Sequence, residues 1–127
     1  MGVSLERIIS GLFIVVGLIN LYPVIGVVGA NTLTNLYGIP FEESNLLILM
    51  RHRAVVFGLI GTFLIVAAVQ RDWQTPALIA GMVSMISFLV VALLEGGYNA
   101  KITTVVIADL VASILLAVAG VLRLVMR

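Results

Sequence analysis

The stretch ITTVVIADLVASILLAVAGVLRLV, residues 102–125, decides the fold of this chain. Its only charged residues are Asp109 and Arg123, and it exceeds the roughly 20 apolar residues that a helix needs to cross a bilayer. Backbone N–H and C=O groups in hydrocarbon must be hydrogen-bonded within the protein, which a helix achieves by itself. We therefore predict a membrane-spanning helix over this stretch.

Three further stretches meet the same length rule. They cover residues 5–28, 44–69 and 76–94. The connections at 70–75 and 96–99 are short and rich in polar residues or glycine, which makes consecutive helices antiparallel. We expect one all-α domain over residues 1–127, an integral membrane four-helix up-down bundle. The longer first connection should contain a short helical turn over residues 31–37.

Local signals also predict where two helices begin. Pro40, followed by the acidic Glu42 and Glu43, resembles the first turn of a helix and suggests that the second helix starts before its apolar stretch. In the third helix, we expect Thr75 to cap the N-terminus and Pro76 to be the first helical residue.

The composition agrees with a membrane protein. The chain of 127 residues is 62% hydrophobic and 10% charged, with a mean hydropathy of +1.27. Its net charge of +1 and scattered basic residues argue against binding to nucleic acid. With no cysteine and one histidine, disulfides, cysteine-ligated metals, bis-histidine haem and most zinc sites are excluded, and we expect no cofactor.

The distribution of Lys and Arg predicts the orientation, because cytoplasmic loops carry the excess of these residues. The side with both termini holds four of them, namely Arg7, Arg71, Arg123 and Arg127. The opposite side holds three, namely Arg51, Arg53 and Lys101. We therefore expect a multi-pass protein of the bacterial inner membrane with both termini in the cytoplasm.

Asp109 is the most informative residue, since a carboxylate in the hydrocarbon of a bilayer costs roughly 2.5–3.5 kcal/mol or more. Each of the other three spans carries a polar group near the same membrane face. We predict a polar layer and candidate ligand-binding residues made of Asn20, Arg51, His52, Glu95 and Asp109.

Within this layer, an ion pair between Arg51 and Asp109, with Asn20 completing the hydrogen bonds, is geometrically reasonable. Two interpretations stay open. The pair could only hold the bundle together, because a buried ion pair is weak evidence even for stability. Alternatively, the layer could form the floor of a pocket that opens to the outer leaflet.

Other residues have simpler interpretations. Arg53 is expected to extend toward lipid phosphate groups, and Tyr22, Tyr37 and Tyr98 to form an aromatic belt at the membrane boundary. Small residues recur at helical spacing on every span and predict close helix contacts, because they allow backbones to approach. The glycines of this set are Gly17, Gly58, Gly61, Gly81 and Gly120.

Three short motifs carry a resemblance to known proteins: RHRAV at 51–55, EGGYN at 95–99 and VIAD at 106–109. Together they resemble a group of small bacterial four-span membrane proteins and, more loosely, the DoxX-like membrane proteins. The resemblance implies a four-helix membrane bundle and no established reaction. Some proteins of this kind carry the label phosphopantetheine adenylyltransferase. This sequence contradicts that label, because it has no Thr/Ser-x-Gly-His motif and no nucleotide-binding α/β pattern.

Our leading functional hypothesis is a non-enzymatic membrane protein whose pocket binds a membrane lipid, a quinone-like compound or another hydrophobic small molecule. One alternative is an intramembrane acid-base enzyme, such as a double-bond isomerase, that uses Glu95 and Asp109, with His52 as a third group. Proton-linked transport is a further possibility, and so is an accessory subunit that contacts a partner membrane protein. Small-residue stripes would also suit a homo-oligomer.

Overall fold

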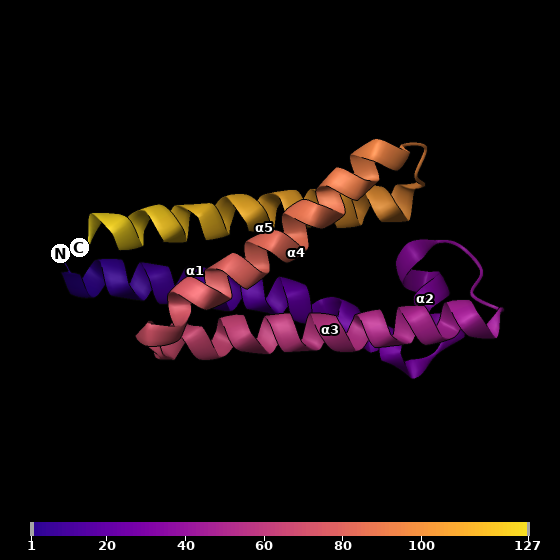
Figure 1. Ribbon diagram of the computed structural model, residues 1–127, viewed down its shortest axis with the longest axis horizontal. Helices are drawn as coiled ribbons and strands as arrows, with labels where there is room; N and C mark the ends of the chain where they lie inside the picture. Colours follow the sequence, from indigo (N-terminus) through magenta and orange to yellow (C-terminus); the bar gives the residue numbers. More distant parts are fainter. Residues whose placement is uncertain (1, 127) are drawn as a thin grey trace.

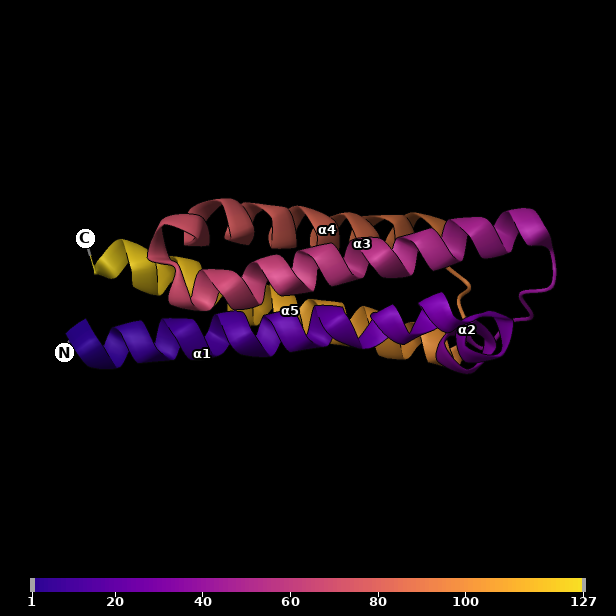
Figure 2. The same cartoon turned by 90° about the horizontal axis from the view of Figure 1, so that it is seen from below.

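The computed structural model describes residues 2–126, so Met1 and the Arg127 used in the orientation argument lie outside the described residues. Four long helices form an antiparallel bundle, and no β-strand occurs within residues 2–126 (Figures 1 and 2). The elements are α1 (Gly2–Leu21), η1 (Tyr22–Val28), α2 (Ala30–Tyr37), α3 (Ser44–Val69), η2 (Arg71–Trp73), α4 (Gln74–Glu95) and α5 (Ala100–Val125). The all-α fold predicted from the sequence is confirmed, including the short helix α2 in the first connection.

Four segments are long and apolar enough to cross a membrane, and they match the predicted spans closely. They are Ser4–Val28, Ser44–Val69, Arg71–Glu95 and Ala100–Val125. Many large apolar side chains point away from the bundle, as expected for helices surrounded by hydrocarbon: Leu59, Leu93 and Ile114 are each more than half exposed. The chain termini lie at one end of the bundle and α2 at the other (Figure 1).

The first span consists of two kinds of helix. At Tyr22 the α-helix α1 changes into the tighter 3₁₀-helix η1, next to Pro23, which has no backbone N–H to continue the α-helical hydrogen bonds. Gly29, with φ of 152°, then turns the chain into α2. Gly38 ends α2 with φ of 74° and donates its N–H to the carbonyl of Thr34.

The second long helix does not begin near Pro40, so that prediction is wrong. Helix α3 starts at Ser44, because the Glu43 carboxylate accepts hydrogen bonds from the backbone N–H groups of Asn45 and Leu46 at 3.0 and 3.1 Å. Before this cap, Phe41 is buried and contacts the ring of Tyr37, with ring centroids 6.1 Å apart.

The predicted start of the third helix is also wrong by two residues. Helix α4 begins at Gln74 without a side-chain cap, directly after the short helix η2. Pro76 lies within the first turn, where a missing N–H breaks no helical hydrogen bond. The Thr75 hydroxyl accepts a hydrogen bond from Arg123 of α5 instead of capping its own helix.

Helices α1 and α3 touch through their backbones at two glycines. A Cβ atom on Gly17 would lie 2.9 Å from the carbonyl oxygen of Gly61, and one on Gly61 would lie 2.8 Å from that of Gly17. No larger residue fits at either position, so the predicted contact role is confirmed for both. The main hydrophobic core of the bundle includes Phe13, Leu64 and Leu116, which are fully buried.

Candidate functional site

Asp109 lies in the tenth position of α5, about 14 Å from the start of that helix along its axis. The residue is only 7% exposed, and its carboxylate has no hydrogen-bond or ion-pair partner among residues 2–126. Its backbone carbonyl accepts a hydrogen bond from the Ser113 hydroxyl at 2.7 Å. A buried polar group without a partner is unfavourable and calls for a physical explanation.

The carboxylate borders a cavity of about 540 Å³ between α1, η1, α2 and α5, which we call the Asp109 cavity. Most of its wall is apolar. The lining residues are Leu18, Ile19, Tyr22, Pro23, Asn35, Leu36, Tyr37, Lys101, Thr104, Val105, Ala108 and Asp109. Its volume lies within the range of about 300–1,000 Å³ that is usual for small-molecule sites.

Helix α5 contributes three polar side chains to the cavity wall, from Lys101, Thr104 and Asp109. Lys101, in the first turn of α5, lies eight residues before Asp109, a separation of about 12 Å along the helix axis. The Thr104 hydroxyl between them donates to the Ala100 carbonyl at 3.2 Å. The cavity thus has the Asp109 carboxylate at one end and the cationic Lys101 at the other, and its wall between them is mostly apolar.

Arg53 does not extend toward lipid phosphates as predicted, but lies between α2, α3 and α4. Its guanidinium donates a 2.9 Å hydrogen bond to the Tyr37 hydroxyl. The guanidinium carbon lies 5.4, 4.5 and 5.5 Å from the ring centres of Tyr37, Phe57 and Phe88, which is cation–π distance. Arg53 is also the cation whose field acts on Asp109.

Tyr37 is therefore not part of an aromatic belt, because it is only 5% exposed. It closes α2 and forms one wall of the Asp109 cavity. Tyr22 and Tyr98, at 66% and 41% exposure, remain on the surface as the sequence suggests.

The predicted ion pair between Arg51 and Asp109 is wrong. The exposed Arg51 donates from its Nε to the Val27 carbonyl at 2.8 Å. That carbonyl ends the helix η1 and needs a donor from outside the helix. Arg51 and the exposed His52 line a separate open groove between α3 and η1, away from the Asp109 cavity.

Asn20 is buried at 2% exposure but lies beside the cavity and not in its lining. Its side-chain NH₂ donates to the Val16 carbonyl at 2.9 Å and contacts the Met85 sulfur at 3.7 Å. Its Oδ1 is buried and has no hydrogen-bond partner within residues 2–126. Asn20 does not complete the hydrogen bonds of Asp109, although it lies at a similar position in the bundle.

Glu95 is the last residue of α4 and is exposed, outside the cavity. Gly96 and Gly97, with φ of 65° and 63°, turn the chain directly after it. Of the five predicted site residues, the structure thus brings only Asp109 into the cavity, and Asn20, Arg51, His52 and Glu95 lie elsewhere.

The sequence analysis missed Asn99, which joins two walls of the cavity. Its Oδ1 accepts from the Ile102 N–H at 2.8 Å and so caps α5, while its Nδ2 donates to the Tyr37 carbonyl at 2.9 Å. An asparagine directly before an apolar helix is a usual N-cap, so the first role was visible in the sequence. The bond to α2 depends on the tertiary fold.

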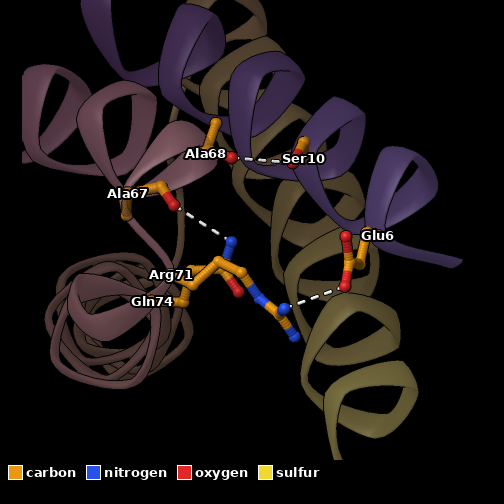
Figure 3. Close-up of polar contacts among 6 residues, drawn as sticks. All are labelled: Glu6, Ser10, Ala67, Ala68, Arg71 and Gln74. Carbon is orange, nitrogen blue, oxygen red and sulfur yellow. Dashed lines mark hydrogen bonds and ion pairs between the residues drawn. The ribbon is translucent and has the colours of Figure 1, made fainter. Parts of the chain in front are cut away.

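A second polar cluster lies where α1, the end of α3, η2 and the start of α4 meet (Figure 3). Glu6 and Arg71 form an exposed ion pair at 2.8 Å. The Ser10 hydroxyl donates to the Ala68 carbonyl at 2.7 Å. Gln74 donates to the Ala67 carbonyl at 3.0 Å. These bonds attach α1 and the start of α4 to the end of α3.

Within residues 2–126, no three His, Cys, Asp or Glu side chains gather in a way that would hold a metal ion. No protein-family model matches this chain, and comparison with curated proteins and with solved structures also gives no match. The assignment therefore rests on the fold and on the site. Four long apolar helices with outward-facing apolar side chains define a multi-pass membrane protein.

Proposed function

We propose that this membrane protein binds an amphipathic small molecule, such as a lipid or a quinone-like compound, in the Asp109 cavity. The observation that carries the proposal is a buried carboxylate that borders an apolar cavity and has no hydrogen-bond or ion-pair partner within residues 2–126. An ionisable residue at membrane depth is costly, and such residues commonly mark functional sites. A ligand with one polar group and an apolar skeleton would satisfy the carboxylate and fill the apolar space.

The position of the cavity supports entry from the bilayer. Leu18 and Tyr22, at 56% and 66% exposure, line it and also lie on the outer surface of the bundle. A molecule dissolved in lipid would meet the cavity laterally, between α5 and the junction of α1 with η1. With the orientation predicted from Lys and Arg, the cavity lies in the outer leaflet of the bacterial inner membrane.

The acid-base enzyme is less well supported. Its proposed proton carriers were Glu95 and Asp109, with His52 as a third group, and two such groups would have to share one site. Neither Glu95 nor His52 lines the Asp109 cavity. A partner membrane protein, homo-oligomerisation and the relationship to DoxX-like proteins stay predictions.

The proposal is tested by identifying the molecules that co-purify with the protein. Ala108 lines the cavity, whereas Ala117 lies on the exposed face of the same helix. Ala108→Leu should fill the cavity and remove the bound molecule, and Ala117→Leu should retain it. Mass spectrometry of organic extracts from both variants and the wild type measures this. Identical extracts from all three proteins would refute the proposal.

A further inference from the structure

The Tyr37 hydroxyl carries a proton that no group within residues 2–126 accepts. Its oxygen accepts a hydrogen bond from Arg53 at 2.9 Å, and within residues 2–126 the hydroxyl itself donates to no acceptor. A tyrosine hydroxyl is both donor and acceptor, so half of its capacity is unused. The side chain is 5% exposed and lines the Asp109 cavity.

Two residues that line the same apolar cavity therefore have unused hydrogen-bonding capacity, one as a donor and one as an acceptor. Tyr37 supplies the donor from α2, and the Asp109 carboxylate supplies the acceptor from α5. The bond from Arg53 also polarises the phenol, which strengthens it as a donor because hydrogen bonds in series reinforce one another.

The charges around the cavity oppose charged ligands at its base. An ammonium group would be attracted by Asp109, but Arg53, which is bonded to the lining residue Tyr37, and the lining residue Lys101 already supply two cations near the cavity. A phosphate or carboxylate group would be repelled by Asp109 and would lose its hydration in an apolar space. A neutral group that both donates and accepts avoids both costs.

We propose that the ligand of the Asp109 cavity carries a hydroxyl group, which donates to the Asp109 carboxylate and accepts from the Tyr37 hydroxyl. This inference rests on the proposed function and specifies its ligand class: a neutral alcohol on an apolar skeleton, as in long-chain alcohols and diacylglycerols. The apolar part of the molecule lies against residues such as Leu18, Ile19 and Val105.

The test uses the full chain in detergent and a long-chain primary alcohol with a photoreactive group in its chain. Four unlabelled competitors share one alkyl chain and differ only in the end group: the alcohol, its methyl ether, the amine and the carboxylic acid. The alcohol should compete at about tenfold lower concentration than the ether, which cannot donate to Asp109. It should also compete better than both charged compounds.

Variants of Tyr37 and Asp109 test the two hydrogen bonds of the ligand hydroxyl separately. Tyr37→Phe should weaken alcohol binding about tenfold, and the matched change Tyr98→Phe, in the exposed α4–α5 connection, should leave it unchanged. Asp109→Asn keeps an acceptor and should retain most of the alcohol binding, whereas Asp109→Val should lose it. If Tyr37→Phe fails to fold, the competitor series on the wild-type chain still decides.

The outcomes distinguish this inference from the proposed function. Equal competition by the alcohol and its ether, or stronger competition by the amine or the acid, would overturn the hydroxyl assignment and leave an amphiphile site in place. If Ala108→Leu is photolabelled as strongly as the wild type, both proposals are overturned.

Discussion

Arg53 on α3 donates a 2.9 Å hydrogen bond to the Tyr37 hydroxyl on α2, which holds a half-buried cation among three aromatic rings. The same tyrosine forms a wall of the Asp109 cavity. Tyr37 thus contacts the cation of α3 through its hydroxyl and lines the same cavity as Asp109 of α5.

Replacing Arg53 should destabilise the protein more than replacing Arg51. Arg53→Gln removes a charged hydrogen bond and cation–π contacts, together about 2–4 kcal/mol. Arg51→Gln removes one exposed bond to Val27 and should cost about 1 kcal/mol or less. Thermal unfolding of both variants in the same detergent measures the difference. A larger loss for Arg51→Gln would contradict the stabilising role of the contacts between Arg53 and the three aromatic rings.

The glycine contact between α1 and α3 predicts that alanine substitutions at Gly61 and Gly11 change the stability in different ways. Gly61→Ala places a Cβ atom 2.8 Å from the Gly17 carbonyl and should cost about 1–3 kcal/mol, because the backbones must separate. Gly11→Ala meets no atom within 4 Å and should be neutral or stabilise by up to about 1 kcal/mol through helix propensity. Unfolding midpoints of the two variants test this; equal midpoints would show that the backbones are not in contact.

Asn99→Ala should loosen the start of α5 and the end of α2 together. The change removes a helix cap worth about 1 kcal/mol and the bond to the Tyr37 carbonyl. Hydrogen exchange should accelerate at the Ile102 amide and in the last turn of α2. The control is Asn31→Ala, at an exposed position of α2 whose side chain makes no hydrogen bond to residues 2–126, and it should leave both regions protected. Faster exchange confined to α5 would argue against the link to α2.

Asp109→Leu should stabilise the ligand-free protein and abolish ligand binding. The wild-type carboxyl is buried and has no hydrogen-bond or ion-pair partner in the described part of the chain, so an apolar side chain of similar size should raise stability by about 1–3 kcal/mol. Thermal unfolding of delipidated protein, followed by photolabelling, measures both effects in one preparation. Destabilisation would instead show that Asp109 has a structural partner within the bundle.

The spans were predictable because hydropathy alone determines them. Each of the four is a continuous apolar stretch, and the membrane requires such a stretch to be helical. The start of α4 was less predictable, since the helix η2 precedes it and makes a capping residue unnecessary. Thr75, which looked like a cap, bonds to Arg123 from a distant part of the sequence.

The site was predictable in one residue only. Asp109 is conspicuous because a carboxylate in an apolar stretch is costly wherever its neighbours lie. Arg51 and Arg53 could not be assigned from the sequence, because neighbouring residues point about 100° apart on a helix and tertiary contacts decide which one faces inward. The free carbonyl of Val27 binds Arg51, and the rings of Phe57 and Phe88 surround Arg53. Phe57 lies one turn after Arg53 on the same helix, but the Val27 carbonyl and the Phe88 ring come from other elements and give no local signal.

Tyr37 has a consequence for energetic coupling in the bundle. Its hydroxyl bonds to α3 through Arg53, and its carbonyl bonds to Asn99 at the start of α5. A molecule held by the same hydroxyl would therefore add its binding free energy to the docking of α2. Filling the cavity and fastening the first connection to the bundle would become one linked equilibrium, in which the occupied protein exchanges its α2 amides more slowly than the empty one.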